Sequence, residues 1–171
     1  MAFAHLHVHS QFSLLDGAIP IKKLAPAVAR LGMGSIALTD HCNLYGAVPF
    51  DKGCKAEGLH PVFGSGIWVQ SQGRDYQDPA GQFGGYHVLL LIQDAVGYRN
   101  LCALITEAIF DGMYYKPRVD LDQLRKYKDG LICLTSGMRG PVRGLLTQGK
   151  PEEALWQATS LAEVFGSENL F

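Results

Sequence analysis

The sequence predicts an α/β fold of about five βα units around a parallel sheet, and three observations support this prediction. Short apolar or β-branched runs alternate with segments of helical periodicity along the 171 residues. Glycine, aspartate or serine bounds these runs, as is common for buried parallel strands. Hydrophobic residues make up 47% of the chain, enough for a well-packed core. About five units are too few to close an eight-strand barrel, so one interpretation is that the chain is a fragment.

The predicted strands are short apolar runs, each too short to be a typical helix. They cover residues 4–8, 35–39, 61–69, 86–92 and 130–135. Residues 169–171 are consistent with the start of another strand. A polar, glycine-rich segment, residues 70–85, is predicted to be a surface loop, and residues 111–119 a turn.

The predicted helices lie between these runs. Ile21, Leu24 and Val28 fall on one face of residues 21–31, and Gly32 ends that segment. The same spacing of apolar residues predicts helices over residues 45–58, 95–110, 121–127 and 151–165.

Composition and charge exclude several classes of protein. The chain has 15 Lys+Arg and 16 Asp+Glu, so its net charge of −1 lacks the basic excess of an autonomous nucleic-acid binder. No stretch approaches ~18 apolar residues, and the first residues, MAFAHLHVHSQF, have neither the basic region nor the long apolar region of a secretory signal. The four cysteines form no CxxC pair and are expected to remain thiols. We therefore expect a cytoplasmic globular domain without membrane contact.

Histidines gather near the predicted strand ends. His5, His7 and His9 alternate along the first predicted strand, so all three should project to one side. An apolar core would not accept three imidazoles, because each buried ring nitrogen needs a partner, and a metal ion supplies one. A histidine-rich surface edge is the alternative.

Two further segments extend this pattern. Asp40 and His41 end an apolar strand, where Asp40 could orient the imidazole, bind a metal ion or cap the next helix. His87 opens the strand HVLLLI, and Asp16 follows the first strand in a turn. Such nitrogen and oxygen ligands suit Zn²⁺, Mn²⁺ or Fe²⁺, and phosphoester hydrolysis is the chemistry that such a cluster favours.

The segments HLHVHSQFSLLDGA, ALTDHCNLYGAVPF, GYRNLCALITEAIFDGMYYKPRVD and GLICLTSG resemble the N-terminal PHP (polymerase and histidinol phosphatase) domain of bacterial DNA polymerase III alpha subunits. This resemblance implies a PHP-type distorted (β/α)₇ TIM-like barrel, incomplete here, with the PHP domain over residues 1–171. It also implies divalent metal ions, Zn²⁺, Mn²⁺ or Mg²⁺, at the carboxyl ends of the strands. The metal ligands that it implies are His7, His9, Asp16, His41 and His87. His5 and Asp40 are expected to orient these ligands without contacting the metal ion themselves.

The chain departs from the family pattern at two ligand positions. Gly66 stands where the resemblance implies a bridging glutamate, and Gly137 where it implies a cysteine or histidine. A further aspartate and histidine of the pattern would lie beyond Phe171. We therefore expect a degenerate site that binds metal weakly or not at all.

The resemblance favours a structural platform within a polymerase alpha subunit. Its expected partners are the rest of that subunit and a proofreading exonuclease subunit, with DNA contacted only in the full polymerase. Two alternatives stay open at this point: a stand-alone metal-dependent phosphoesterase, and a non-catalytic module that docks a partner.

Overall fold

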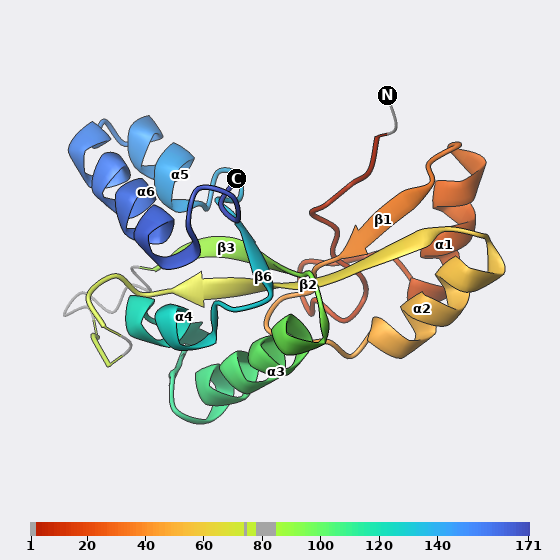
Figure 1. Cartoon of the computed structure of the whole chain (residues 1–171), viewed down its shortest axis with the longest axis horizontal. Coiled ribbons are helices and arrows are strands. Elements are labelled where there is room, and N and C mark those ends of the chain that lie inside the picture. Colours follow the sequence, from red (N-terminus) through yellow and green to blue (C-terminus); the bar gives the residue numbers. More distant parts are fainter. Residues whose placement is uncertain (1–2, 74, 78–84) are drawn as a thin grey trace. The chain divides into compact units, whose positions relative to one another are not determined.

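The computed structural model describes residues 3–73, 75–77 and 85–171, and the chain divides into two compact units, residues 1–65 and 66–171. Helices and strands alternate within it, so the α/β class is confirmed (Figure 1). No helix among the described residues combines the length and the apolar character needed to cross a membrane.

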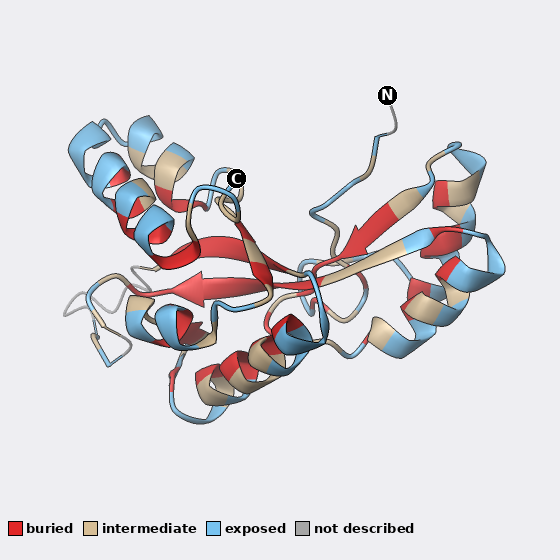
Figure 2. Cartoon of the chain, viewed as in Figure 1, coloured by how far each residue is buried: buried red, intermediate tan, exposed pale blue. Residues whose placement is uncertain are grey.

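The first unit contains two helices and a pair of parallel strands. Strand β1 (Ser35–Leu38) pairs with residues 60–63 of β2 (His60–Val69), and α1 (Ile21–Arg30) packs against α2 (Ala47–Ala56). The core lies between these elements, and Figure 2 colours its buried residues red. Its buried members are Ile21, Leu24, Ala25, Val28, Ile36, Leu38, Phe50, Cys54 and Leu59.

The second unit is built on a sheet to which β2 also contributes. The strand order is β4 (Met113–Tyr114), β5 (Lys116–Val119), β2, β3 (Tyr86–Ile92) and β6 (Leu131–Leu134). Helix α3 (Ala95–Phe110) packs against β5 and α4 (Leu121–Tyr127), and α5 (Pro141–Thr147) packs against α6 (Pro151–Phe165).

The prediction of a uniformly parallel sheet is wrong in the second unit. β1 and β5 run parallel to β2, but β3 pairs antiparallel with β6, and β4 pairs antiparallel with β5. The predicted turn over residues 111–119 contains this β4–β5 hairpin. Apolar runs report that a strand is buried but not in which direction it runs. The inserted hairpin also means that β3 and β6 are not joined by a single strand–helix–strand crossover.

Two of the shorter predictions have different outcomes. Leu170 forms a parallel bridge with Cys133, so the predicted strand start at residues 169–171 does pair with β6. The predicted loop over residues 70–85 lies partly outside the described residues. Its described part, residues 70–73, 75–77 and 85, contains no helix or strand beyond β2.

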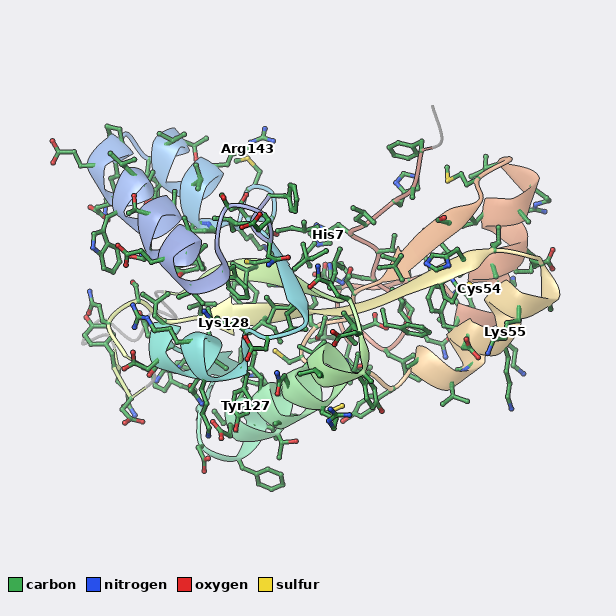
Figure 3. All side chains as sticks on the ribbon, in the orientation of Figure 1. His7, Cys54, Lys55, Tyr127, Lys128 and Arg143 are labelled. Atoms are coloured by element: carbon green, nitrogen blue, oxygen red, sulfur yellow. The ribbon has the colours of Figure 1, made fainter. Side chains whose placement is uncertain are left out.

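Glu107 on α3 joins α3 to α4. Its carboxylate accepts hydrogen bonds from Lys126 Nζ (2.6 Å), from the Tyr127 hydroxyl and from Gln123 Nε2 (3.1 Å). Tyr127 is labelled in Figure 3. These hydrogen bonds, that from Lys126 first, lower the pKa of Glu107 from 4.5 to about 2.

Replacing Glu107 with glutamine should reduce the free energy of unfolding by about 1 kcal/mol at neutral pH. Because the folded-state pKa lies below the unfolded value, the carboxylate stabilises the fold above pH 4.5, and this contribution disappears as the pH falls toward 2. Urea denaturation across this range checks it: the difference between wild type and Glu107→Gln should shrink on acidification. Asp122→Asn, which removes an exposed pair with Arg125, is the matched control and should cost under about 0.5 kcal/mol. A constant difference at all pH values would contradict the prediction.

Candidate metal centre

The histidine-rich N-terminal segment is extended but is not a regular strand, so the prediction of a strand over residues 4–8 is wrong. It lies along β1, where Ala37 N donates to His5 O and Thr39 N donates to Val8 O, both at 2.9 Å. Val8 N donates to the Thr39 hydroxyl at 2.9 Å, and this side-chain contact replaces a regular ladder bond. The segment is nevertheless held beside β1, and its histidines lie near the carboxyl end of that strand.

Asp40 is buried two residues after the end of β1 and anchors the loop that follows the histidines. Its carboxylate accepts hydrogen bonds from Ser10 N (2.6 Å), Ser10 Oγ (2.7 Å) and Ser13 Oγ (2.6 Å). Its backbone carbonyl accepts from Ser65 Oγ at 2.7 Å. Asp40 therefore reaches the imidazoles through Ser13, which also accepts from His41 N at 3.1 Å.

Three donor groups of the first unit converge beside this network. One ligand atom from each of His9, Asp16 and His41 can be chosen so that all lie within 4.8 Å of one another. His41 Nε2 lies 2.9 Å from Asp16 Oδ2, and the rings of His9 and His41 stack with centroids 4.1 Å apart. His7 joins the group, because its Nε2 lies 2.9 Å from His9 Nε2. We call His7, His9, Asp16 and His41 the imidazole cluster.

The hydrogen bonds around Ser13 favour one tautomer of His9. The Ser13 hydroxyl has one hydrogen and donates it to Asp40, so the 3.4 Å contact with His9 Nδ1 requires that nitrogen to carry a hydrogen. The lone pair of neutral His9 then lies on Nε2, the atom that faces His7. A histidine binds a metal ion through such a nitrogen lone pair while its other ring nitrogen donates a hydrogen bond to a second group.

The electrostatics of the imidazole cluster keep its first histidines neutral. Burial first, and then the neighbouring His41 and His7, lower the pKa of His9 to about 4, against the opposing effects of Asp16 and Asp40. Burial and His41 also lower the pKa of His7, against the opposing effect of Asp16. Neutral imidazole is the form that binds metal ions, so protons compete weakly for His9 near neutral pH.

The donor set fits a divalent metal ion. Three imidazoles and one carboxylate are typical ligands of Zn²⁺ and Mn²⁺. Asp16 is exposed and supplies the negative charge, while Asp40 and Ser13 hold the histidine-bearing segments from the buried side. The hydrogen-bonded backbone thus arranges the donors before any ion binds.

Two predicted site residues, His87 and His5, have other surroundings in the structure. His87 belongs to the second unit, where it is buried, its Nδ1 lies 3.1 Å from Ser136 Oγ, and its ring packs edge-on against Trp68. His5 is exposed and packs edge-on against Phe3. The ligand role of His87 and the supporting role of His5 stay predictions.

Ser10 and Ser13 are the residues of this site that the sequence analysis missed. Both are buried, and both connect Asp40 to the histidine segment. The one available signal was their spacing after the histidines, in HSQFSLLDG. The loop that contains them also has a residue with an unfavourable backbone conformation. Leu15, next to Asp16, is fully exposed and has a left-handed backbone with φ 68°, which is rare for leucine.

The family of this chain follows from comparison with known proteins. The PHP domain model matches residues 5–171, so the chain belongs to the PHP domain family. It is 42% identical over 172 residues to the DNA polymerase III subunit alpha of Treponema pallidum and 38% identical over 168 residues to that of Borreliella burgdorferi. These alignments cover 100% and 97% of this chain but only 15% of each relative, and they fall in the N-terminal region of the alpha subunits.

Solved structures resemble the chain more weakly. An amidohydrolase from Chromobacterium violaceum has a TM-score of 0.48 and 19% identity, over 97% of this chain and 51% of that chain. A two-domain protein from Bacteroides vulgatus, described as containing a predicted PHP-like metal-dependent phosphoesterase, has a TM-score of 0.48 and 15% identity, over 92% of this chain and 48% of that chain.

Proposed function

We propose that this chain is the PHP region of a DNA polymerase III alpha subunit and serves there as a metal-binding structural platform. The observation that carries the proposal is the imidazole cluster, in which His9, Asp16 and His41 converge within a chain of the PHP family. The chain corresponds to 15% of the length of the relatives, so polymerase activity and DNA binding would belong to the rest of such a subunit. That remainder, and an exonuclease subunit, are the partners we propose. We also propose a cytoplasmic location, which the scattered cysteines without a CxxC pair favour.

The residues proposed to hold the ion are His7, His9, Asp16 and His41, all in the first unit. A bound divalent ion would lower the pKa of water and offset phosphate charge. The chain's own contribution is orientation: Asp40 fixes Ser13, and Ser13 holds His9 and the backbone of His41. Asp16 brings the carboxylate beside His41.

We infer that phosphoester hydrolysis by this chain is weak or absent. Gly66 and Gly137 carry no side chain at positions where the resemblance implies metal ligands. A Cβ at Gly137 would meet no atom within 4 Å, so a side chain would fit there. The donor, rather than the space for it, is therefore missing at Gly137. With fewer carboxylates, the charge of a second ion would be poorly compensated.

Calorimetric titration of the apo protein with Zn²⁺ and Mn²⁺ tests the proposal. Saturable binding is expected, and His9→Gln or Asp16→Asn should weaken it by at least about tenfold. His60→Gln removes an exposed histidine at the start of β2, outside the cluster, and is the matched control that should bind as the wild type does. Equal binding by His9→Gln and His60→Gln would overturn the metal site. Metal-dependent cleavage of a model phosphodiester that is lost in His9→Ala would overturn the inference of weak activity.

A further inference from the structure

Helix α6 is buried on one side and exposed on the other (Figure 2). It packs against α5, α4 and β6, all within the second unit. The residues that it buries recur at helical spacing, and they are Ala154, Gln157, Ser160, Leu161, Val164 and Phe165. The helix is thereby fixed on its own unit, and its opposite side has a defined shape before any partner binds.

Two large apolar side chains stand on the solvent side of α6, where Leu155 is 69% exposed and Trp156 is 52% exposed. The exposed residues around them follow helical spacing, since positions three or four apart share one face of a helix. We call this set the outer face of α6, and it consists of Glu152, Leu155, Trp156, Thr159, Ala162 and Glu163. Tryptophan is usually buried in isolated domains and is frequent in binding hot spots, so this face has the composition of a docking surface.

The outer face carries an excess of negative charge. Residues 151–171 contain four glutamates and no lysine or arginine. One of these, Glu153, is offset by Lys150, whose Nζ lies 3.1 Å from its carboxylate. Glu152 and Glu163, on the outer face, form no ion pair among the described residues. The tryptophan therefore lies between two unpaired carboxylates, one about one turn before it and the other about two turns after it.

This charge decides which partner fits the outer face. Nucleic acids and anionic lipid surfaces carry negative charge and would be repelled. A second copy of the chain, in a two-fold symmetric dimer, would bring the same face against itself and place glutamates beside glutamates. A protein segment with arginine or lysine beside apolar side chains has the opposite charge and a matching surface. Its cations can lie over the Trp156 ring and pair with Glu152 or Glu163.

We propose that the outer face of α6 docks a basic, amphipathic segment of a partner protein. Apolar side chains of that segment pack against Leu155 and Trp156. Its cations lie beside Glu152 and Glu163. Helix α6 has 15 residues and is about 22 Å long, so it matches a helical segment of similar length lying along it. The docking surface goes beyond the function proposed above and does not depend on it, because no residue of the imidazole cluster takes part.

Fluorescence anisotropy of a labelled synthetic peptide, titrated with the whole chain in chelator, tests the proposal. The peptide is an amphipathic helix of about 15 residues, with leucine along one face and arginine on both sides of that face. A second peptide has the same leucine face and glutamate in place of arginine. Saturable binding is expected for the arginine peptide, and raising the salt concentration should weaken it. The absence of saturable binding, or equally tight binding of the glutamate peptide, would overturn the proposal.

Four variants at exposed positions, which should all keep the fold, locate the binding. Trp156→Ala should weaken it by about tenfold, whereas Tyr98→Ala on α3, an aromatic residue that is also 52% exposed, should leave it unchanged. Glu163→Lys should weaken it by a similar factor, whereas Glu57→Lys, at an exposed glutamate of the first unit, should not. Equal affinities within either pair would show that the peptide binds elsewhere. Self-association of the wild type that is lost in Trp156→Ala would assign the face to a second copy, and either result would overturn the proposal.

Discussion

Replacing Asp40 with alanine is expected to lower the free energy of unfolding by about 4 kcal/mol and to remove divalent-ion binding. The carboxylate is 1% exposed and accepts three hydrogen bonds from Ser10 and Ser13, so alanine leaves three donors without their acceptor in a buried space. The loop that holds the imidazoles would lose its anchor at the same time. Urea denaturation and calorimetric titration with Zn²⁺ measure the two effects.

The Asp40→Asn variant separates charge from geometry. An asparagine oxygen can still accept from Ser10 N and Ser13 Oγ, while its amide can donate to the Ser10 hydroxyl once that hydroxyl turns. We expect about 1–2 kcal/mol of destabilisation and partial retention of ion binding. A loss of less than about 1 kcal/mol in Asp40→Ala would show that the network contributes little to stability.

Replacing Gly17 with alanine is expected to destabilise the fold by about 2–3 kcal/mol and to weaken Zn²⁺ binding at least tenfold. A Cβ at Gly17 would lie 1.9 Å from the carbonyl oxygen of Ser10, which is a backbone atom and cannot turn aside. The loop would have to open, and the adjacent Asp16 carboxylate would move away from His41. Thermal unfolding and metal titration of the same preparations test both effects.

Gly34→Ala provides the matched control. Gly34 is exposed, and a Cβ there would meet nothing within 4 Å. Its unfolding free energy should stay within about 0.5 kcal/mol of the wild type, and its ion binding should not change. If Gly17→Ala behaved as Gly34→Ala does, the close approach of Gly17 to Ser10 would not constrain the site.

The helices were predictable wherever an apolar stripe could pack. Residues 95–110, 121–127 and 151–165 have the bounds that the structure gives to α3, α4 and α6. Helix α5 is as short as α4 and was missed because its sequence, PVRGLLT, includes Gly144, which lowers helix propensity. Strand direction was also beyond prediction, because the contacts that decide it come from distant parts of the chain.

The four residues of the imidazole cluster were predictable from the sequence, but the serines that support them were not. The sequence pointed to His7, His9, Asp16 and His41 because imidazoles near strand ends need partners, and the structure brings these four residues together. The alternation argument behind this prediction was wrong, since the histidine segment is not a regular strand. Ser10 and Ser13 were missed because serine is common in loops, and nothing local indicates that its hydroxyl will meet a buried carboxylate.

The irregular backbone of the histidine segment affects how tightly an ion can be held. Residues 5–8 are tied to β1 by few main-chain hydrogen bonds, so this segment should detach at a smaller free energy than the core helices do. Only the docked state presents His7 and His9 beside His41. The observed affinity is therefore the intrinsic affinity multiplied by the docked fraction, and bound ion in turn favours docking. Amide hydrogen exchange at Val8 and Thr39 would slow on metal addition, so exchange rates in this one segment report occupancy without an enzymatic assay.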